Sequence, residues 1–113
     1  MGIKIRTNQQ IYIIDLDGDI ELADANLLKD LVMKMIEKKV ERFIINAQNV
    51  NSIDSSGLGA FIFISSTLKK LGMALAIANV KGPVKNVIEK TKLGSCFPIY
   101  EELNEAIEAL SKN

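Results

Sequence analysis

Apolar and polar residues follow a two-residue period at the start of the chain. Residues 2–7 (GIKIRT) alternate between the two classes, and residues 11–17 (IYIIDLD) are β-branched and mostly apolar. These patterns predict an edge strand and a more buried strand, paired as a hairpin around a turn at 8–10. Gly18 and Asp19 are expected to end the second strand. Three more apolar segments predict further strands, at 40–46, 73–80 and 97–100.

A helical period separates these strands and predicts four helices. The first begins within residues 19–28 (DIELADANLL), has Glu21 or Asp24 near its N-terminal end and stops near Lys39. Its expected apolar stripe is Leu27, Leu28, Leu31, Val32, Met35 and Ile36. The second helix covers 57–71 and carries a stripe of Leu58, Phe61, Ile64, Leu68 and Leu71.

Glycine and proline mark several helix ends. Gly72 is placed to end the second helix, because glycine readily adopts the left-handed conformation after a last turn. Gly82 and Pro83 open the third helix, whose stripe is Val84, Val87, Ile88 and Leu93. Residues 101–111 predict a fourth, amphipathic helix. Pro98 confines the strand before it to a sheet edge.

The order of these elements predicts the fold class. Strands that alternate with helices indicate an α/β fold with a mixed, mainly parallel sheet of four to five strands and four helices. The antiparallel pair is the N-terminal hairpin. We expect residues 1–113 to form a single domain.

Composition narrows the function classes. The chain has 14 basic and 14 acidic residues, which is not the basic balance of a nucleic-acid binder. The first ten residues lack a signal-peptide core, and no apolar run approaches the ~20 residues that span a bilayer. With one cysteine and no histidine, we expect a cytoplasmic protein that binds no nucleic acid, membrane, metal or cofactor.

Residues 52–61 (SIDSSGLGAF) place an acid, two serines and two glycines between a predicted strand and a predicted helix. A nucleophile elbow needs Gly-x-Ser-x-Gly and a base, but residues 53–57 read IDSSG and the chain has no histidine. The segment is not a phosphate-binding P-loop either, because no Gly-Lys-Ser/Thr follows Gly57. We therefore expect no enzyme.

Two interpretations of this segment remain open. Asp54, Ser55 or Ser56 can cap the helix through a side-chain oxygen. Alternatively, a serine at this position is a phosphorylation switch, because the helix N-terminus accommodates a phosphate that adds a charge of about −1.5 to −2. Such a change alters what can dock without unfolding the domain.

The helix that follows has two further features. Phe63 points away from the apolar stripe, where it either packs on a neighbouring helix or contacts a partner. Gly57 and Gly59 lower helix stability by up to ~1 kcal/mol each. We expect them to permit close approach of another backbone, either the sheet or a partner.

The segment DSSGLGAF, preceded by the strand residues FIIN and by GDIELADA about 35 residues earlier, resembles the anti-sigma factor antagonists, which are single STAS domains of bacteria. The resemblance spans nearly the whole chain and implies the STAS fold. It also implies binding to an anti-sigma factor, a serine kinase of the histidine-kinase-like ATPase type, with release of the sigma factor for transcription.

The resemblance assigns roles to particular residues. The kinase phosphorylates the serine after the acid, which is Ser55 here, with Ser56 as the rival acceptor, and a PP2C-type phosphatase restores the unmodified form. The implied partner surface comprises Asp19, Glu21, Asp24, Asp54, Ser56, Gly57, Leu58 and Phe63. A monomer suits the family. The alternative is a STAS scaffold, or an accessory subunit of a stressosome-like or lipid-transport assembly.

The chain departs from the family pattern at two places. Glu21 occupies the position of a common aspartate, so its carboxylate lies one methylene further out. The strand before the switch reads Asn46-Ala47 where Asp-Leu is usual, and Ser52 takes an apolar position. Neither departure touches Ser55.

Overall fold

The computed structural model describes residues 2–91 and 98–111. Within these residues, five strands form one sheet in the order β1-β2-β3-β4-β5. The strands are β1 (Gly2–Asn8), β2 (Ile11–Ile20), β3 (Arg42–Ile53), β4 (Ala74–Ala78) and β5 (Ile99–Tyr100). β1 and β2 are antiparallel, and the other neighbours are parallel. The expected α/β fold and its N-terminal hairpin are confirmed.

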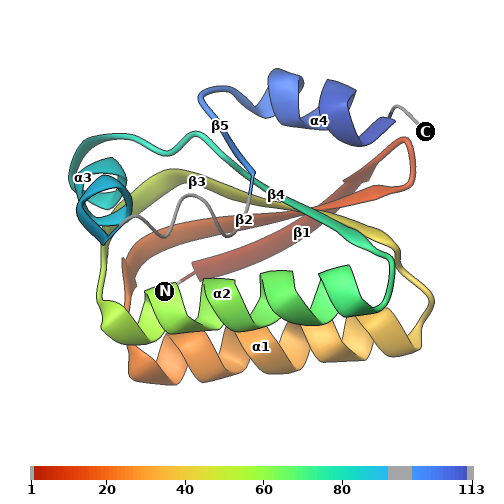
Figure 1. Cartoon of the computed structure of the whole chain (residues 1–113), viewed down its shortest axis with the longest axis horizontal. Coiled ribbons are helices and arrows are strands. Elements are labelled where there is room, and N and C mark those ends of the chain that lie inside the picture. Colours follow the sequence, from red (N-terminus) through yellow and green to blue (C-terminus); the bar gives the residue numbers. More distant parts are fainter. Residues whose placement is uncertain (1, 92–97, 112–113) are drawn as a thin grey trace.

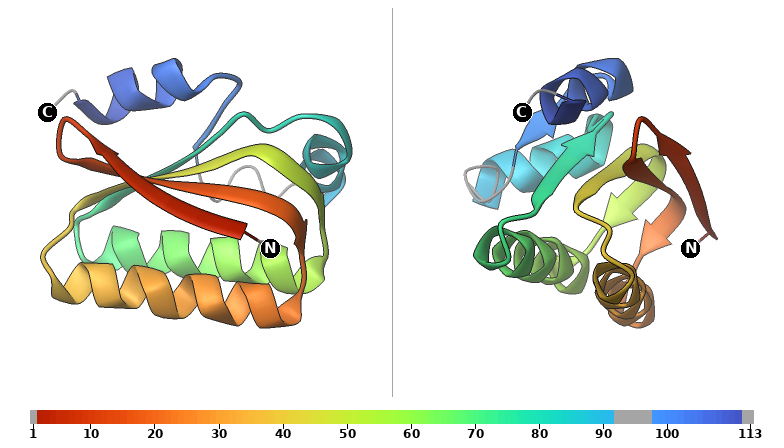
Figure 2. Two further views of the ribbon diagram at one scale, coloured as in Figure 1. Left: turned by 180° about the vertical axis from the view of Figure 1, so that it is seen from behind. Right: turned by 90° about the vertical axis from the view of Figure 1, so that its right-hand side faces the viewer.

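Helices cover both faces of this sheet (Figures 1 and 2). The helices are α1 (Leu22–Glu37), α2 (Ser55–Lys70), α3 (Gly82–Thr91) and α4 (Leu103–Ser111). α1 and α2 lie side by side on one face, and α4 lies on the other. α1 and α2 run in the same direction, and both begin at the end of the sheet where β2 and β3 terminate. That end of the sheet carries the site described below.

Two apolar cores flank the sheet. The larger one lies under α1 and α2, contains Phe43, Phe61 and Leu28, and also receives Val84 and Ile88 of α3. The smaller one lies under α4 and includes Ile13 and Ala106. None of the helices in the described ranges combines the length and apolar character needed to cross a lipid bilayer.

Turn residues explain several element ends. Gln9 and Gln10 both have positive φ, 53° and 68°, which is the conformation of a two-residue hairpin turn. Gly72, at φ 74°, follows the last turn of α2 as predicted. Gly82 and Pro83 open α3, also as predicted.

Two predicted strand ends were wrong. β2 does not stop at Gly18 but continues to Ile20. Gly18 adopts φ 86°, and the pairing with β3 is irregular there, but β2 stays paired with β3 on both sides of Gly18. β3 does not stop at residue 46 but continues to Ile53 in the same pairing. β2 and β3 consequently end together, directly before α1 and α2.

Two predicted core residues were also wrong. Leu27 and Leu71 are more than half exposed, although both were placed on buried stripes. Leu27 lies about 100° around α1 from the buried Leu28, away from the buried face, and Leu71 follows the last residue of α2, where the chain turns away. Leu93 and Phe97 lie outside the described residues.

Candidate functional site

The site lies where β2 and β3 end next to each other. Ile20 and Ile53 are neighbours in the parallel pairing, and the Asp54 backbone N–H donates to the Ile20 carbonyl oxygen at 3.3 Å. Beside them, the Ser52 hydroxyl donates to the Asp19 carboxylate at 2.8 Å. These bonds join the C-terminal ends of β2 and β3. Ser52, which takes an apolar position of the family pattern, thereby links the two strands.

Asp54 is the residue that caps α2. It has an extended backbone, and its carboxylate accepts a hydrogen bond from the Gly57 backbone N–H at 2.9 Å. The sequence alone did not decide which of Asp54, Ser55 and Ser56 makes the cap. Ser55 is the first residue of the helix rather than the residue before it, and its side chain is exposed. Because Asp54 makes the cap, the Ser55 hydroxyl is not needed to cap α2.

The neighbouring serine is in a different environment. Ser56 is only partly exposed, whereas Ser55 is exposed. The structure therefore places the predicted phosphoacceptor on the surface and its rival in a more enclosed position.

Acidic side chains gather where α1 and α2 begin. Glu21 is the N-cap of α1, and its backbone N–H donates to the Asp24 carboxylate at 3.1 Å. Asp19, Glu21 and Asp54 are exposed, and Asp24 is partly exposed. Negative charge is favourable at helix N-termini, so these acids stabilise α1 and α2 while giving this edge an anionic surface.

Gly57 is required by close packing. A Cβ built on Gly57 would lie 2.6 Å from Ile53 Cγ1 and 2.9 Å from Ile20 Cγ2. The sheet does approach Gly57 closely, but it does so through the side chains of Ile53 and Ile20, so the prediction of a close backbone was wrong. Nothing in the described chain lies within 4 Å of a Cβ on Gly59. The sheet therefore gives no reason for Gly59, and approach by a partner stays a prediction.

Exposure separates the predicted partner residues into two groups. Gly57 and Leu58 are buried, Leu58 to 5% exposure, so the domain itself covers them and they lie outside the accessible surface. Phe63 is 48% exposed, and the Lys29 ammonium lies 5.4 Å from the centroid of its ring. Phe63 therefore reaches the surface that continues from Ser55 along α2.

Leu22 is an exposed apolar residue that the sequence analysis missed. It opens α1 and is 61% exposed, immediately after Glu21. An apolar residue in the first turn, outside the helical stripe, was the signal that would have identified it. Leu22 adds apolar area to a surface that is otherwise mostly acidic.

Asn46 is a buried polar residue whose role the sequence analysis also missed. It is 6% exposed, and its amide donates to Asp15 at 2.7 Å. Its side-chain oxygen accepts from the Asn79 amide at 2.7 Å and from the Gln48 backbone N–H at 3.2 Å. Because buried polar groups require partners, an asparagine inside an apolar strand was a usable signal.

Asp15 connects this network to Arg6. Arg6 donates two hydrogen bonds to the Asp15 carboxylate, at 2.7 and 3.1 Å. Partial burial by itself raises the pKa of Asp15, but the hydrogen bonds from Arg6 and Asn46 and the charges of Arg6 and Lys4 outweigh it. The pKa of Asp15 consequently lies below its usual value, and the same bond raises the pKa of Arg6.

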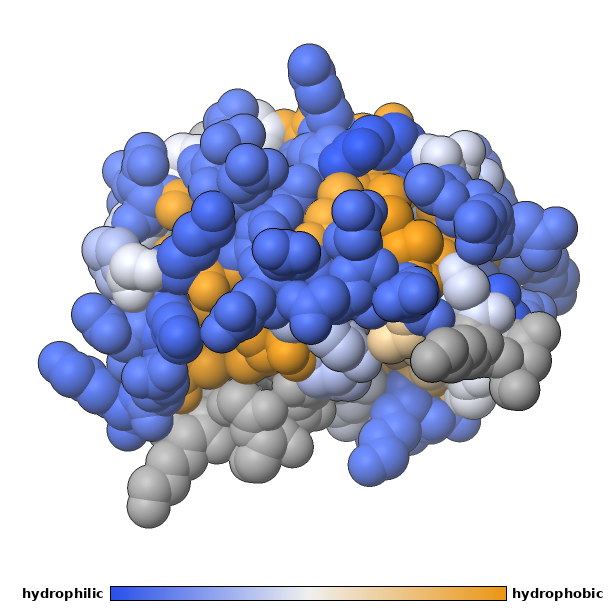
Figure 3. All heavy atoms as spheres, turned by 90° about the horizontal axis from the view of Figure 1, so that it is seen from above, coloured by the Kyte–Doolittle hydropathy of each residue, from blue (hydrophilic) through white to orange (hydrophobic). Residues whose placement is uncertain are grey.

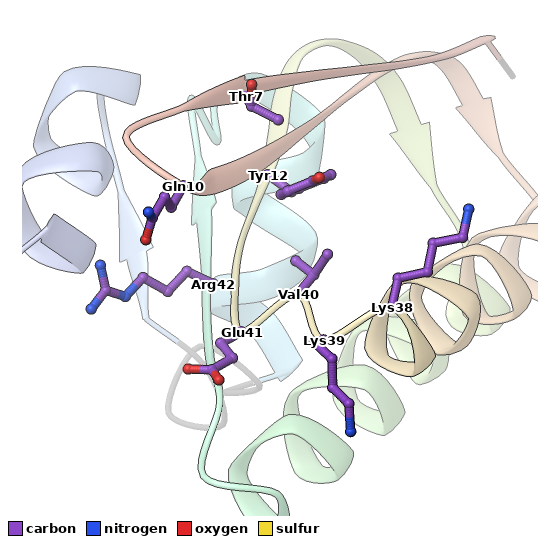
Figure 4. A pocket seen from close by; sticks show the side chains of 8 residues that line it. All are labelled: Thr7, Gln10, Tyr12, Lys38, Lys39, Val40, Glu41 and Arg42. Atoms are coloured by element: carbon purple, nitrogen blue, oxygen red, sulfur yellow. The ribbon is translucent and has the colours of Figure 1, made fainter.

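A hollow of about 550 Å³ lies at the opposite end of the sheet, near the end of α1. Figure 4 shows that the side chains of Lys38, Lys39 and Arg42, which line this hollow, point in three different directions. These cations do not converge on one ligand position. Among the described residues, no three Asp, Glu, Cys or His side chains gather as a metal site.

Comparison with known proteins identifies the family. A family model described as the STAS domain matches residues 2–106. The chain belongs to the STAS domain family. This STAS domain is 23% identical over 110 residues to the anti-sigma F factor antagonist of Paenibacillus polymyxa, a match that covers 96% of this chain and 94% of the relative. The family resemblance given by the sequence is thereby confirmed.

Two further comparisons place the fold. Sulfate transporter 3.1 of Arabidopsis thaliana is 26% identical over 122 residues, covering 94% of this chain but 18% of the transporter. The structure of Bacillus SpoIIAA, an anti-sigma factor antagonist, in its unphosphorylated form matches with a TM-score of 0.75 and 16% identity, covering 99% of this chain and 100% of SpoIIAA. The phosphorylated form matches with a TM-score of 0.74 and 17% identity, covering 96% of this chain and 98% of SpoIIAA. At these identities the structural likeness shows the fold alone.

Proposed function

We propose that this STAS domain is an anti-sigma factor antagonist that phosphorylation of Ser55 switches off. The observation that carries the proposal is the exposed Ser55 hydroxyl in the first turn of α2, beside an aspartate that already caps the helix. The relative named as an anti-sigma F factor antagonist, matched over 96% of this chain, supports the same function.

The unmodified form binds an anti-sigma factor kinase through the surface around Ser55. Its described components are the exposed acids Asp19, Glu21 and Asp54, together with the apolar side chains of Leu22 and Phe63. Aromatic side chains frequently dominate the affinity of such interfaces. Binding occupies the kinase and releases the sigma factor for transcription.

Phosphorylation then weakens this complex. The Ser55 oxygen forms a bond to the γ-phosphorus of ATP held by the kinase, the bond from that phosphorus to ADP breaks, and the hydroxyl proton leaves. The new group adds about −1.5 to −2 charge next to Asp54. An added charge that the interface must desolvate without a partner costs several kcal/mol.

A PP2C-type phosphatase resets the switch. Water replaces the Ser55 oxygen on phosphorus, which releases inorganic phosphate and restores the hydroxyl. Ser55 stays accessible for this step because it lies on the surface and Asp54, rather than Ser55, caps the helix. The cycle requires neither a metal nor a cofactor bound to the STAS domain, which we propose acts as a cytoplasmic monomer.

Mass spectrometry of the chain after incubation with its kinase and ATP tests the acceptor directly. We expect one phosphate, on Ser55, that Ser55→Ala removes and Ser56→Ala retains. Phosphate on Ser56 in the wild type, with Ser55 unmodified, would move the switch to its neighbour. An unmodified chain after prolonged incubation with an active kinase would contradict the proposal.

A second candidate function is that of a structural STAS domain within a larger assembly. The match to sulfate transporter 3.1, of which this chain spans 18%, favours it. Light scattering of the chain without any kinase distinguishes the two functions. A stable large assembly favours the structural role, and a monomer that binds the kinase favours the antagonist.

A further inference from the structure

β1 forms an open edge of the sheet. Within the residues that the structure describes, it is the first strand in the sheet order and pairs with β2 alone. It is seven residues long and has no proline, and its register with β2 runs from Gly2 to Asn8 without a bulge. Such an edge presents a row of unpaired backbone groups, which many proteins shorten, bend or cover. β5, at the other edge, is only two residues long. β1 is therefore the edge with room for another strand.

The hairpin turn determines which backbone groups of β1 point outward. Both residues of this turn have positive φ, and in such a turn the flanking residues, here Asn8 and Ile11, form a hydrogen-bonded pair. Hydrogen-bonded and non-hydrogen-bonded pairs then alternate along the antiparallel strands. The residues of β1 in non-hydrogen-bonded pairs are consequently Ile3, Ile5 and Thr7. Their N–H and C=O groups point away from β2 and offer donors and acceptors to an incoming strand.

The side of this edge that faces α1 is apolar. Ile3 is partly buried against the larger core, whereas Ile5, on the same face of β1, is 45% exposed. Leu27 of α1 is 60% exposed and lies about 200° around the helix from Lys29, which reaches over to Phe63 of α2. Leu27 therefore points away from α2, towards the side of the molecule on which β1 lies (Figure 2). An incoming strand buries apolar side chains on this side.

The opposite side of the edge is cationic. Lys4 and Arg6 alternate with the isoleucines and face the side of the sheet on which α4 lies, where hydrophilic side chains form most of the surface (Figure 3). Arg6 is bonded twice to Asp15 of β2, but Lys4 forms no ion pair with another described residue. Asp15 lies one strand further in, so the outermost charges are positive. An acidic side chain on an incoming strand would lie directly opposite Lys4, and such cross-strand pairs are favourable.

The same cations disfavour pairing with a second copy of this chain. Antiparallel registers that join most of two β1 strands through their outward-facing groups centre on Ile5, Lys4 or Arg6. The first register places Lys4 opposite Arg6 of the second copy, and the other two place Lys4 or Arg6 opposite itself. Like charges directly opposite each other are destabilising. The edge therefore favours a strand of a different protein, in agreement with the monomer proposed above.

We propose that the β1 edge binds an extended segment of a second protein in which acidic and apolar residues alternate. The backbone of the segment pairs with the outward-facing groups of β1, its apolar side chains lie beside Ile5, and an acid lies opposite Lys4. In this mode of recognition the main-chain bonds supply affinity and the alternate side chains supply specificity. Ser55 follows β3, and β2 separates β3 from β1, so this surface is distinct from the proposed switch.

Titration of the ¹⁵N-labelled chain with a blocked heptapeptide of alternating valine and glutamate tests the proposal. We expect saturable amide shifts confined to β1 and slower hydrogen exchange at Ile3, Ile5 and Thr7. Peptide at about 10 mM fills roughly nine-tenths of a site whose Kd is about 1 mM, so this range reveals even weak binding. The same peptide with lysine in place of glutamate is the charge control, and we expect it to bind about tenfold more weakly.

Substitutions in β1 separate the charge from the backbone contribution. Lys4→Glu is expected to reverse the preference, so that the lysine peptide binds more tightly than the glutamate peptide. Ile5→Pro removes an outward-facing N–H and should abolish binding of both peptides, whereas Ile5→Ala keeps that N–H and should weaken binding less. Lys90→Glu, on α3 at the other side of the molecule, is the matched control and should bind as the wild type does.

Absence of saturable shifts at about 10 mM would overturn the proposal, as would equal binding of the two peptides or an unchanged preference in Lys4→Glu. Light scattering that shows a dimer of the free chain, lost in Ile5→Pro, would assign the edge to a second copy and overturn it as well. Phosphorylation of Ser55 is measured in parallel on the Lys4→Glu variant. Failure of the edge proposal is thereby distinguishable from failure of the switch.

Discussion

The Asp54 carboxylate accepts a 2.9 Å hydrogen bond from the Gly57 backbone N–H, and this bond spans Ser55 and Ser56 in the first turn of α2. A capping aspartate and an exposed serine thus divide two tasks that one residue could have performed alone. The acid stabilises the helix, and the hydroxyl stays free to react. Under the proposed function, a phosphate on Ser55 would change the charge of the surface and leave the capping bond in place.

Asp54→Ala is expected to lower the free energy of unfolding by about 1 kcal/mol, because the Gly57 N–H loses its acceptor. Asp54→Asn keeps an oxygen at this position and should lose only part of that amount. Urea denaturation of both variants measures the difference. Equal stability of Asp54→Ala and the wild type would show that the cap contributes nothing.

Gly57→Ala and Gly59→Ala form a matched pair on one helix. The alanine at 57 meets Ile53 and Ile20 at under 3 Å, and overpacking of this kind costs about 1–3 kcal/mol. The alanine at 59 meets open space and should stabilise the helix by up to about 1 kcal/mol. Thermal unfolding distinguishes the two signs, and the same sign for both would refute the packing argument.

If Gly59 instead allows close approach of the kinase, the affinity of the kinase for the Gly59→Ala variant will show it. Gly59→Ala should then weaken binding even though it stabilises the free domain, whereas a purely structural glycine would leave the affinity unchanged.

Phe63→Ala is expected to weaken kinase binding at least tenfold and to change stability by less than about 1 kcal/mol, the scale of an exposed cation–π contact with Lys29. Leu71→Ala is the control, since Leu71 is similarly exposed at the other end of α2. Titration calorimetry with the kinase compares them. Equal affinity for both variants would place the interface elsewhere.

Acidification should remove a stabilising contribution that depends on Asp15. Because its pKa is lower in the folded chain than the usual 3.8, this contribution is complete well above pH 3.8 and is lost as the pH falls through the folded value. Asp15→Asn should flatten this part of the stability profile between about pH 5 and pH 2. A profile identical to that of the wild type would exclude Asp15 as the titrating group.

Local patterns were sufficient to predict the order of strands and helices, the hairpin and the glycine after α2. They failed where tertiary pairing overrides a local stop signal. Gly18 looks like the end of a strand, yet β2 pairs with β3 on both sides of it. The end of β3 was missed for the same reason, since Gln48, Asn49 and Asn51 are polar but still lie in the strand.

The candidate site was predictable in part. The DSSG segment alone left Asp54, Ser55 and Ser56 open, and the family resemblance was needed to choose Ser55. Only the packing of α2 on the sheet shows that Leu58 is covered and Phe63 is not. The Asn46 network joins residues up to 33 positions apart, from three strands and the loop that follows β4. Spacing along the chain carries no signal for such a contact.

The central claim is that charge on Ser55 controls binding of the kinase. The most direct measurement is the Kd of the kinase for the unmodified chain and for the chain phosphorylated on Ser55, with Ser55→Ala treated identically as the control. A penalty of about 3 kcal/mol predicts roughly hundredfold weaker binding of the phosphorylated chain and no change for Ser55→Ala. Equal affinity of the two forms would contradict the switch.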